Sequence, residues 1–301
     1  MHWCFVVNPM AGGGKAKRNL PRLKAQLNEN NIDHIIAETI KPKHGVELVK
    51  DLALSGERLF VAVGGDGSLN EVLQGIFESE LPVSDFTLTV LPWGSGNDWA
   101  RFHKIPRETD KWILFFKHQR KVKHDIGIAS FGVEFESKHA FINLAGTGLD
   151  CMVLQEMGQA AGLSFRYYLT MLRCLRSYKA VNFSVTHDGS LLEAPALILV
   201  NCLGRYGGAG MDFAPEADVN NGKFNGLCIK DMPFIQRLLG LRYLLNGSIN
   251  QHDRVINYVS REVEISGNRE WYFECDGELI AALPVRLTTH PQALYVLSNL
   301  S

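Results

Sequence analysis

The sequence lacks an excess of either charge and any long apolar run. Its 31 basic and 32 acidic residues give a net charge of −1, which argues against a nucleic-acid-binding protein, because such proteins carry a basic excess. No stretch approaches the roughly 18 apolar residues of a transmembrane helix. The apolar run at residues 3–7 is too short for the core of a signal peptide, and no Lys or Arg precedes it. We therefore expect a cytoplasmic protein with no transmembrane segment.

Cysteine is also sparse and dispersed. The six cysteines include no Cys-x-x-Cys pair, so cysteine-based metal sites are excluded, and a chain this long needs no disulfide framework. Glycine, in contrast, is in excess: the 28 glycines are about 9% of the 301 residues, against an average of roughly 7%. At about 150 residues per domain, this length suggests two domains.

Three glycine-rich segments follow a common pattern in the first hundred residues. Each comes after a short β-branched or aromatic run, at residues 3–7, 59–63 and 87–91, and each precedes a helical pattern. A further strand at 32–38 and a helix at 46–54 lie between the first two segments. Alternating strands and helices predict an α/β fold with a parallel sheet, in which ligands bind at the carboxyl ends of the strands. We expect all three glycine-rich segments at that edge.

The pattern changes near residue 122, where short, often alternating runs separated by turn signals predict antiparallel strands. Strands are expected at residues 121–129, 141–144, 181–187, 196–202, 227–230, 263–266 and 271–275. Helices are expected at 165–178 and 233–245. We expect an α/β domain over residues 1–121 and a β-rich domain over 122–287. Whether the tail 288–301 completes the first domain is left open.

Glycine-rich turns that lead into helices suit phosphate binding, since exposed N–H groups and the helix dipole favour negative charge. The common nucleotide motifs are absent, however. Lys17 and Asn70 stand where a dinucleotide-binding loop would place its third glycine. Pro9 and Ala16 replace the first glycine and the hydroxyl residue of a Walker A loop. The sequence therefore predicts phosphate binding outside these two classes.

Carboxylates accompany two glycine-containing motifs. Asp66 lies inside the second loop, where its charge requires Mg²⁺, a proton or backbone N–H partners, and the alternative is a turn aspartate before a capped helix. Asp276 and Glu278 flank Gly277, a spacing that suits a general base and a metal ligand. The alternative for this late motif is a hairpin turn.

Six segments, taken together, carry a family resemblance. They are Asn-Pro with three glycines at 8–14, Gly-Gly-Asp-Gly-Ser within 64–72, Gly-Ser-Gly-Asn-Asp within 91–98, residues 143–150, Tyr-Gly-Gly-Ala-Gly-Met within 206–217, and Asp-Gly-Glu at 276–278. In this order, over nearly the whole chain, they resemble the diacylglycerol kinase catalytic-domain family of lipid kinases, which includes sphingosine and ceramide kinases. The resemblance implies an α/β nucleotide-binding domain, similar to that of NAD kinase, followed by a β-sandwich domain, with ATP in the cleft between them.

The resemblance also implies a site. The implied nucleotide contacts are Asn8, Gly12, Gly13, Gly14, Thr39, Gly64, Gly65, Asp66, Gly67, Ser68, Asn70, Glu71, Ser95 and Asn97. Lys15 is placed by sequence to neutralise phosphate charge. Asp276 and Glu278 would provide the contact to a catalytic Mg²⁺ held through the nucleotide and the base that takes the hydroxyl proton. Asp66 would order the Mg²⁺–phosphate network or act as the base itself, so three carboxylates stay open for that role.

Two departures from the family pattern bear on this site. Ser68 and Ser95 replace the threonines usual in bacterial members, and both keep a hydroxyl. Bacterial members also carry an Asp-Gly that helps to hold a structural Mg²⁺, where this chain has Asn221 before Gly222. Since an amide offers only a neutral oxygen and Lys223 lies next to it, we predict that this second metal site is weak or absent.

The leading hypothesis is an ATP- and Mg²⁺-dependent lipid kinase that phosphorylates a diacylglycerol-like alcohol. The alternatives are a kinase of a soluble substrate related to NAD kinase and a catalytically silent nucleotide- or lipid-binding regulator. Residues 165–179 carry four basic and no acidic residues, which fits a helix at a membrane surface or a packed helix with a basic edge. The lipid head group, a homodimer and peripheral attachment to the inner membrane face are left open.

Overall fold

The structure, a computed structural model, describes residues 2–158, 164–267 and 271–300, and its description of side chains in the helix that starts at 164 begins at residue 169. The contacts between Cα atoms divide the chain into two compact units. Unit 1 runs to His124 and resumes at Gln292, and unit 2 is Asp125–Pro291. Unit 1 therefore takes its last segment from the end of the chain.

Unit 1 is an α/β domain with a parallel sheet. Its strands are β1 (Trp3–Val7), β2 (His34–Glu38), β3 (Leu59–Gly64), β4 (Thr87–Pro92) and the end of β17 (Val285–Leu297). They pair in the order β2-β1-β3-β4-β17, all parallel within this unit. The helices are α1 (Ala11–Glu29), α2 (His44–Leu54), α3 (Asp66–Glu78), α4 (Asp98–Phe102) and α5 (Thr109–His118).

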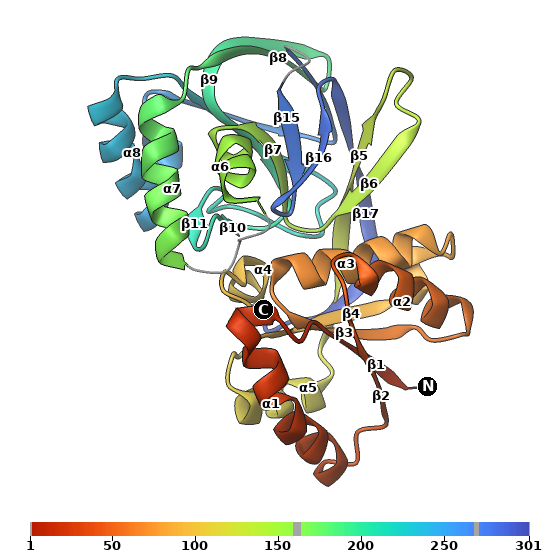
Figure 1. Ribbon diagram of the computed structural model, residues 1–301. Coiled ribbons are helices and arrows are strands. Elements are labelled where there is room, and N and C mark those ends of the chain that lie inside the picture. The colour runs from red at the N-terminus through yellow and green to blue at the C-terminus, as the bar shows by residue number, and fades with distance from the viewer. Residues whose placement is uncertain (1, 159–163, 268–270, 301) are drawn as a thin grey trace. The chain divides into compact units, whose positions relative to one another are not determined.

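The helices lie on both faces of this sheet, with α2 and α3 on one face and α1 and α5 on the other (Figure 1). The strands are near-continuous apolar runs because both of their faces are covered. The rings of Phe5 in β1 and Trp112 and Phe116 in α5 pack together with centroids 4.7–6.0 Å apart. The predicted parallel α/β fold is confirmed.

Unit 2 is a β-sandwich-like domain with three helices. In chain order its elements are β5 (Lys121–Phe131), β6 (Ser137–Phe141), β7 (Leu144–Gly148), α6 (Leu149–Met157), α7 (Ser164–Ser177), β8 (Val181–His187), β9 (Ser190–Cys202), β10 (Tyr206–Gly207), β11 (Met211–Asp212), β12 (Phe224–Lys230), α8 (Phe234–Asn246), β13 (Val255–Ser260), β14 (Glu262–Ser266), β15 (Tyr272–Cys275), β16 (Glu278–Ala282) and most of β17. The strand pairs described within this unit are antiparallel, among them β7 with β9, β8 with β9 and β12 with β13.

Two hydrophobic clusters hold unit 2 together. One is enclosed by its strands and is dominated by buried rings, those of Phe141, Phe183, Phe224 and Phe273. The other lies where α6, α7 and α8 meet β9 and β12, and contains residues such as Leu175 of α7. The helices of unit 2 therefore cover one side of its sheet rather than extending it.

The structure corrects the predicted elements at several places. The strand predicted at 141–144 is divided, because β6 ends at Phe141 and β7 starts at Leu144, and the N–H groups between them bond to a side chain instead. The helices α5 and α6 and the strands β13 and β16 had not been predicted. The expected first glycine loop lies within the bounds of α1, where Gly12–Gly14 have left-handed backbone angles rather than helical ones. In the part of the chain that the structure describes, no helix has the length and apolar character needed to cross a membrane.

Candidate functional site

The three glycine-rich loops of unit 1 meet at one sheet edge, as predicted for parallel strands. Gly12, Gly13 and Gly14 follow β1, and their φ angles are +58°, +66° and +81°. A Cβ on Gly12 would overlap the carbonyl oxygen of Trp93 in the loop after β4, whereas one on Gly13 would meet nothing within 4 Å. Gly12 thus permits close packing of two loops, and Gly13 borders open space.

The second and third loops also touch. The N–H of Gly94 donates to the carbonyl oxygen of Gly64 at 2.8 Å, and a Cβ on Gly94 would overlap the Cα of Gly65. The Asn97 side chain closes the third loop, since its Oδ1 accepts from Gly94 N–H at 3.1 Å and its Nδ2 donates to Gly94 O at 2.7 Å. Asn97 is therefore a loop-forming residue, with a left-handed φ of +59°.

Asp66 joins the second loop to α4. Its Oδ2 accepts from the backbone N–H of Asp98, and its Oδ1 accepts from that of Trp99, both at 3.1 Å. Burial raises the pKa of the Asp66 carboxyl above its usual value, although these N–H donors act in the opposite direction. Backbone N–H groups, one of the partners considered for this charge, are therefore present at Asp66.

Glu71 is bound to backbone as well. Its Oε1 accepts from Lys43 N–H at 3.2 Å and its Oε2 from Gly45 N–H at 2.8 Å, at the start of α2. The structure thus uses this predicted nucleotide contact to join α3 to α2. Lys15, at the same edge of the sheet as the glycine loops, is half-buried and has no ion pair with any described residue.

The other predicted nucleotide contacts lie at the same edge or just behind it. The N–H of Thr39, after β2, donates to Val7 O at 2.8 Å, and the Oδ1 of Asn8, after β1, accepts from the N–H of Met10 at 3.0 Å. Ser95 and Gly67 are exposed, Ser68 is half-buried over Gly64, and Asn70 is buried inside α3. The edge therefore offers exposed backbone and hydroxyl groups, and its roles in binding stay predictions.

In unit 2, Asp276 occupies a two-residue turn between β15 and β16. Its φ is +50° and that of Gly277 is +86°, so the predicted hairpin turn is present. The carboxylate is nevertheless more than a turn residue. Oδ1 accepts from the N–H groups of Asn143 and Leu144 at 2.9 and 3.1 Å, and Oδ2 accepts from that of Ile142 at 2.9 Å. These bonds fix the orientation of the buried Asp276 side chain.

A pair of buried carboxyl groups lies behind this turn. Glu274 in β15 pairs with Gly146 in β7, and its Oε2 accepts from Gly277 N–H at 2.8 Å. The Oδ2 of Asp150 lies 3.2 Å from where a Cβ on Gly146 would be, is buried, and has no hydrogen-bond partner. Burial raises the pKa of Asp150 to about 7, and burial followed by the charge of Asp150 raises that of Glu274 well above its usual value.

Asp150 and Glu274 were missed as candidate site residues. Asp150 belongs to one of the segments that carried the resemblance, and Glu274 precedes Asp276 by two residues, the same spacing as between Asp276 and Glu278. Alternation along β15 could have placed Glu274 on the inner face, but nothing in the sequence shows that β7 carries a glycine opposite it. That register follows only from the pairing of the two strands.

The carboxylates of Asp276 and Glu278 could bind Mg²⁺ together with the phosphates of a nucleotide. Among residues 2–158, 164–267 and 271–300, no group of three or more His, Cys, Asp and Glu side chains could hold a metal ion. Oxygen donors such as Asp276 and Glu278 suit Mg²⁺, which commonly binds one or two carboxylates together with substrate phosphates. The fit is therefore to an ion that arrives with a nucleotide. At the doubtful second site, Asn221 Oδ1 accepts from Lys223 N–H at 2.9 Å.

Comparison with known proteins gives these features a context. The family model of the diacylglycerol kinase catalytic domain matches residues 2–129, and the model described as the YegS C-terminal NAD kinase beta sandwich-like domain matches residues 143–298. A diacylglycerol kinase of Staphylococcus aureus (strain bovine RF122 / ET3-1) is 26% identical over 93% of this chain and 87% of its own. One of Bacillus subtilis (strain 168) is 25% identical over 93% of this chain and 90% of its own.

A solved structure shows the same fold. The crystal structure of a diacylglycerol kinase from Bacillus anthracis str. Sterne superposes with a TM-score of 0.77 at 20% identity, over 99% of this chain and 97% of that one. The two family models together span almost the whole sequence and include every motif on which the resemblance rested. This chain belongs to the diacylglycerol kinase family of lipid kinases, which are phosphotransferases with an alcohol acceptor.

Proposed function

We propose that this protein uses ATP and Mg²⁺ to phosphorylate the hydroxyl group of a diacylglycerol-like lipid. The observation that carries the proposal is the Asp276 carboxylate, which three backbone N–H groups hold in one orientation beside Glu278. A silent relative has no need to fix a carboxylate in this way. The names of the relatives from Staphylococcus aureus and Bacillus subtilis, both diacylglycerol kinases, support the lipid acceptor.

Unit 1 would hold the nucleotide at the edge where its glycine loops meet. Gly13 and Gly67 would admit phosphate oxygens close to the backbone, since a Cβ on either residue would meet nothing within 4 Å. Lys15 would offset phosphate charge, because no described carboxylate neutralises it. Asp66 would maintain the shape of the third loop through its bonds to Asp98 and Trp99.

In unit 2, Asp276 and Glu278 would divide two tasks, orienting the ion and accepting a proton. Mg²⁺, when bound with the nucleotide, would offset negative charge on the phosphate oxygens. The lipid hydroxyl oxygen forms the new bond to the γ-phosphorus while the bond to the β–γ bridging oxygen breaks and ADP leaves. The hydroxyl proton passes to a carboxylate oxygen. Catalysis on this scheme depends on positioning and on charge, which are the properties that a fixed carboxylate provides.

The direct test is transfer of labelled phosphate from ATP to a panel of lipids in mixed micelles, with NAD as a soluble acceptor. We expect a labelled diacylglycerol product that requires Mg²⁺. Asp276→Asn, Glu278→Gln and Asp66→Asn should be compared, and the variant that removes the base should lose at least about 10²-fold in kcat. Asp253→Asn is the matched control, since its side chain is 88% exposed.

The outcomes separate the alternatives. Labelling of NAD in place of every lipid would identify a soluble-substrate kinase. Binding of ATP without any transfer would identify a silent regulator. If Asp276→Asn and Glu278→Gln both phosphorylated diacylglycerol at the wild-type rate, the assignment of this motif would be wrong.

A further inference from the structure

The outer face of α7 is partly apolar. Met171, Cys174 and Leu175 point into the cluster beneath the helix and are nearly inaccessible. Leu169 and Leu172, one turn apart, are 52% and 40% exposed on the other side. A surface helix of a globular protein ordinarily presents polar residues there, so these leucines require a separate explanation.

The outer face of α8 is also apolar, and it exposes more apolar side chains than that of α7. Its only fully buried side chain is that of Leu244. Ile235 and Leu239, four residues apart, are 71% and 56% exposed, and Leu238 and Leu245 extend the stripe at 37% and 64%. We define the α7–α8 face by its six exposed apolar side chains: Leu169, Leu172, Ile235, Leu238, Leu239 and Leu245. Exposed apolar patches rimmed by polar residues mark interaction sites.

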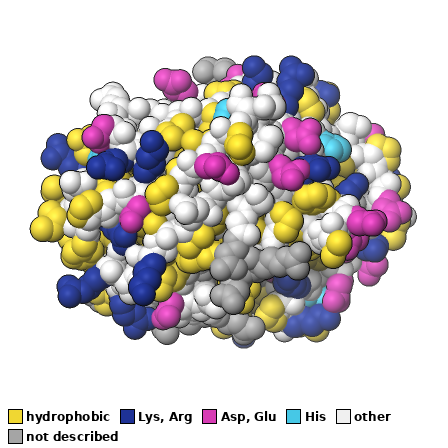
Figure 2. All heavy atoms as spheres, turned by 90° about the horizontal axis from the view of Figure 1, so that it is seen from above, with side chains coloured by type: hydrophobic (Ala, Val, Ile, Leu, Met, Phe, Trp, Pro, Cys, Tyr) yellow, Lys and Arg dark blue, Asp and Glu magenta, His cyan; other side chains and the backbone are white. Residues whose placement is uncertain are grey.

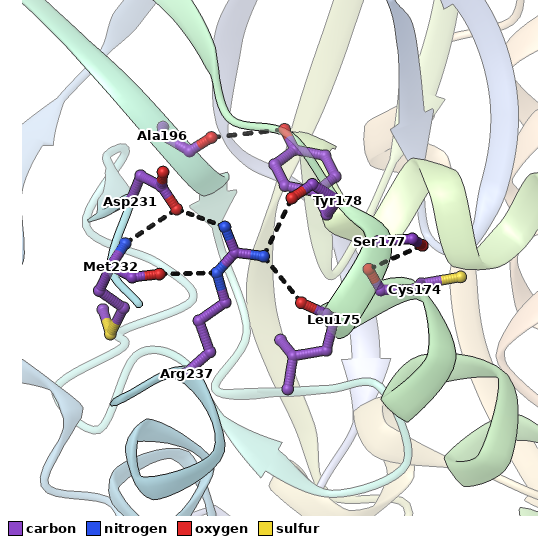
Figure 3. A network of polar contacts seen from close by, with 8 residues as sticks. All are labelled: Cys174, Leu175, Ser177, Tyr178, Ala196, Asp231, Met232 and Arg237. Atoms are coloured by element: carbon purple, nitrogen blue, oxygen red, sulfur yellow. Dashed lines mark hydrogen bonds and ion pairs between the residues drawn. The ribbon is translucent and has the colours of Figure 1, made fainter. Parts of the chain in front are cut away.

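The two helices form one surface because Arg237 ties them together. In Figure 3 its guanidinium lies between the end of α7 and the segment that leads into α8. Nη1 donates to the carbonyl oxygens of Leu175 and Tyr178 at 2.7 and 3.0 Å, and Nε donates to that of Met232 at 2.8 Å. Nη2 bonds to Asp231 Oδ1 at 2.6 Å. Exposed leucines on both helices therefore stay in a fixed relation to each other.

The charged residues on and near α7 and α8 indicate what kind of partner this face would bind. Neither α7 nor α8 contains an Asp or Glu. Two acidic residues close by are already paired, Glu156 with Arg173 and Asp231 with Arg237. Arg176 stacks on Phe234 with its Cζ 5.8 Å from the ring centroid, and Arg242 is exposed on the outer side of α8. Figure 2 shows basic side chains interspersed with hydrophobic ones on the side of unit 2 where Figure 1 places these helices.

We propose that the α7–α8 face docks unit 2 onto a membrane that contains anionic lipids. Apolar side chains of both helices enter the boundary between head groups and acyl chains, while Arg176 and Arg242 meet lipid phosphates. The absence of Asp and Glu from both helices, together with the exposed arginines, favours an anionic lipid surface, because basic amphipathic helices are attracted to anionic lipids. The proposal rests on the proposed function only in that a lipid kinase must reach its substrate at a membrane.

Vesicle co-sedimentation of the full chain tests this without ATP or any acceptor lipid. Wild-type protein should bind vesicles of phosphatidylcholine with phosphatidylglycerol, and bind them less at high salt. Leu239→Glu combined with Leu245→Glu should weaken binding at least about tenfold. Leu191→Glu is the matched control because this leucine of β9 is 66% exposed outside the face, and it should bind as wild type. Arg242→Glu should reduce only the part of the binding that depends on anionic lipid.

Three results would overturn the proposal: no vesicle binding by the wild type, equal binding by the double variant, or equal loss in the Leu191→Glu control. A wild-type dimer that the double variant converts to a monomer, with vesicle binding unchanged, would assign the face to a second copy instead. Circular dichroism confirms that the variants are folded, and substitution of exposed side chains should leave the spectrum unchanged. Phosphorylation of short-chain diacylglycerol in detergent is measured separately, so failure of the kinase assay leaves the docking result standing.

Discussion

At the scale of single residues, Gly12 and Gly13 are adjacent and similar in backbone but differ in surroundings. Both have left-handed φ angles, and only at Gly12 would a Cβ overlap another loop. Gly13→Ala should cost the backbone penalty alone, about 1–2 kcal/mol of unfolding free energy. Gly12→Ala should cost clearly more, by about 1–3 kcal/mol. Denaturant unfolding of the two variants measures the difference, and equal losses would contradict the close approach to Trp93.

Substitutions of Asp276 and Glu278 should differ in their effect on stability. In Asp276→Asn, the nitrogen that replaces one oxygen faces a backbone N–H group, so at least one of the three bonds is lost. We expect a loss of about 1–3 kcal/mol in unfolding free energy. Glu278→Gln is isosteric and should be much closer to wild type in stability. Thermal unfolding of both variants, followed beside activity, checks the contrast; a fully stable Asp276→Asn would argue that these bonds are weak.

At the scale of elements, Glu71 links two helices that are distant in the sequence. Its oxygens accept from Lys43 and Gly45 at the first turn of α2. Glu71→Gln turns one of these acceptors into a donor and should cost about 1–2 kcal/mol of unfolding free energy. Glu47→Gln in α2 serves as control, because that side chain is exposed and its ion pair is with Lys41 on the surface. ATP titration of both variants then tests whether Glu71 also contacts the nucleotide.

The Arg237 bonds can be tested in the same way. Its side chain is 9% exposed, and removing the guanidinium takes this donor from three carbonyl oxygens and the ion pair from Asp231, which keeps its bond to the N–H of Met232. Arg237→Met should lower the unfolding free energy by about 3 kcal/mol. Arg242→Met, an exposed arginine of the same helix, should lower it far less. Similar losses in the two variants would show that Arg237 does not hold the helices.

The sequence predicted helices and strands best where the hydrophobic periodicity and the positions of glycine-rich turns indicate the same bounds. The bounds of β1 and β8 are those expected, and the helices after β3 and β4 were placed correctly. At 141–144 the apolar run concealed a break, since N–H groups there bond to Asp276, which is more than 130 residues away. No local pattern reveals such a partner. The same limit hid the Glu274–Asp150 pair, which exists only through strand register.

At the scale of the whole molecule, the buried Asp150 carboxyl makes stability depend on pH. Its pKa is about 7 in the folded protein, against about 3.9 when unfolded, so the folded state retains a proton that the unfolded chain releases. Stability should therefore fall as pH rises from about 4 through 7. The contribution is about 2–3 kcal/mol between pH 5 and 8.

Asp150→Asn should reduce this slope, while the raised pKa of Glu274 leaves a further contribution of the same sign, and the unfolding free energy of the variant should exceed that of wild type most at pH 8. The measurement is denaturant unfolding of both proteins from pH 5 to 8, with the exposed Asp253→Asn variant expected to follow the wild type. Parallel pH profiles for wild type and Asp150→Asn would show that this carboxyl ionises freely in the folded state.

The return of the chain to unit 1 has a consequence for biosynthesis. Residues Tyr295 and Val296 of β17 pair with Thr87 and Leu88 of β4, so the last strand of the first sheet is made after all of unit 2. Until residues 295 and 296 have left the ribosome, that side of β4 lacks its neighbour and presents an open strand edge, which can pair with strands of other chains. A truncation after residue 124 would leave the edge open permanently. The synthesis of β17 therefore sets the time at which this edge of the first sheet is covered.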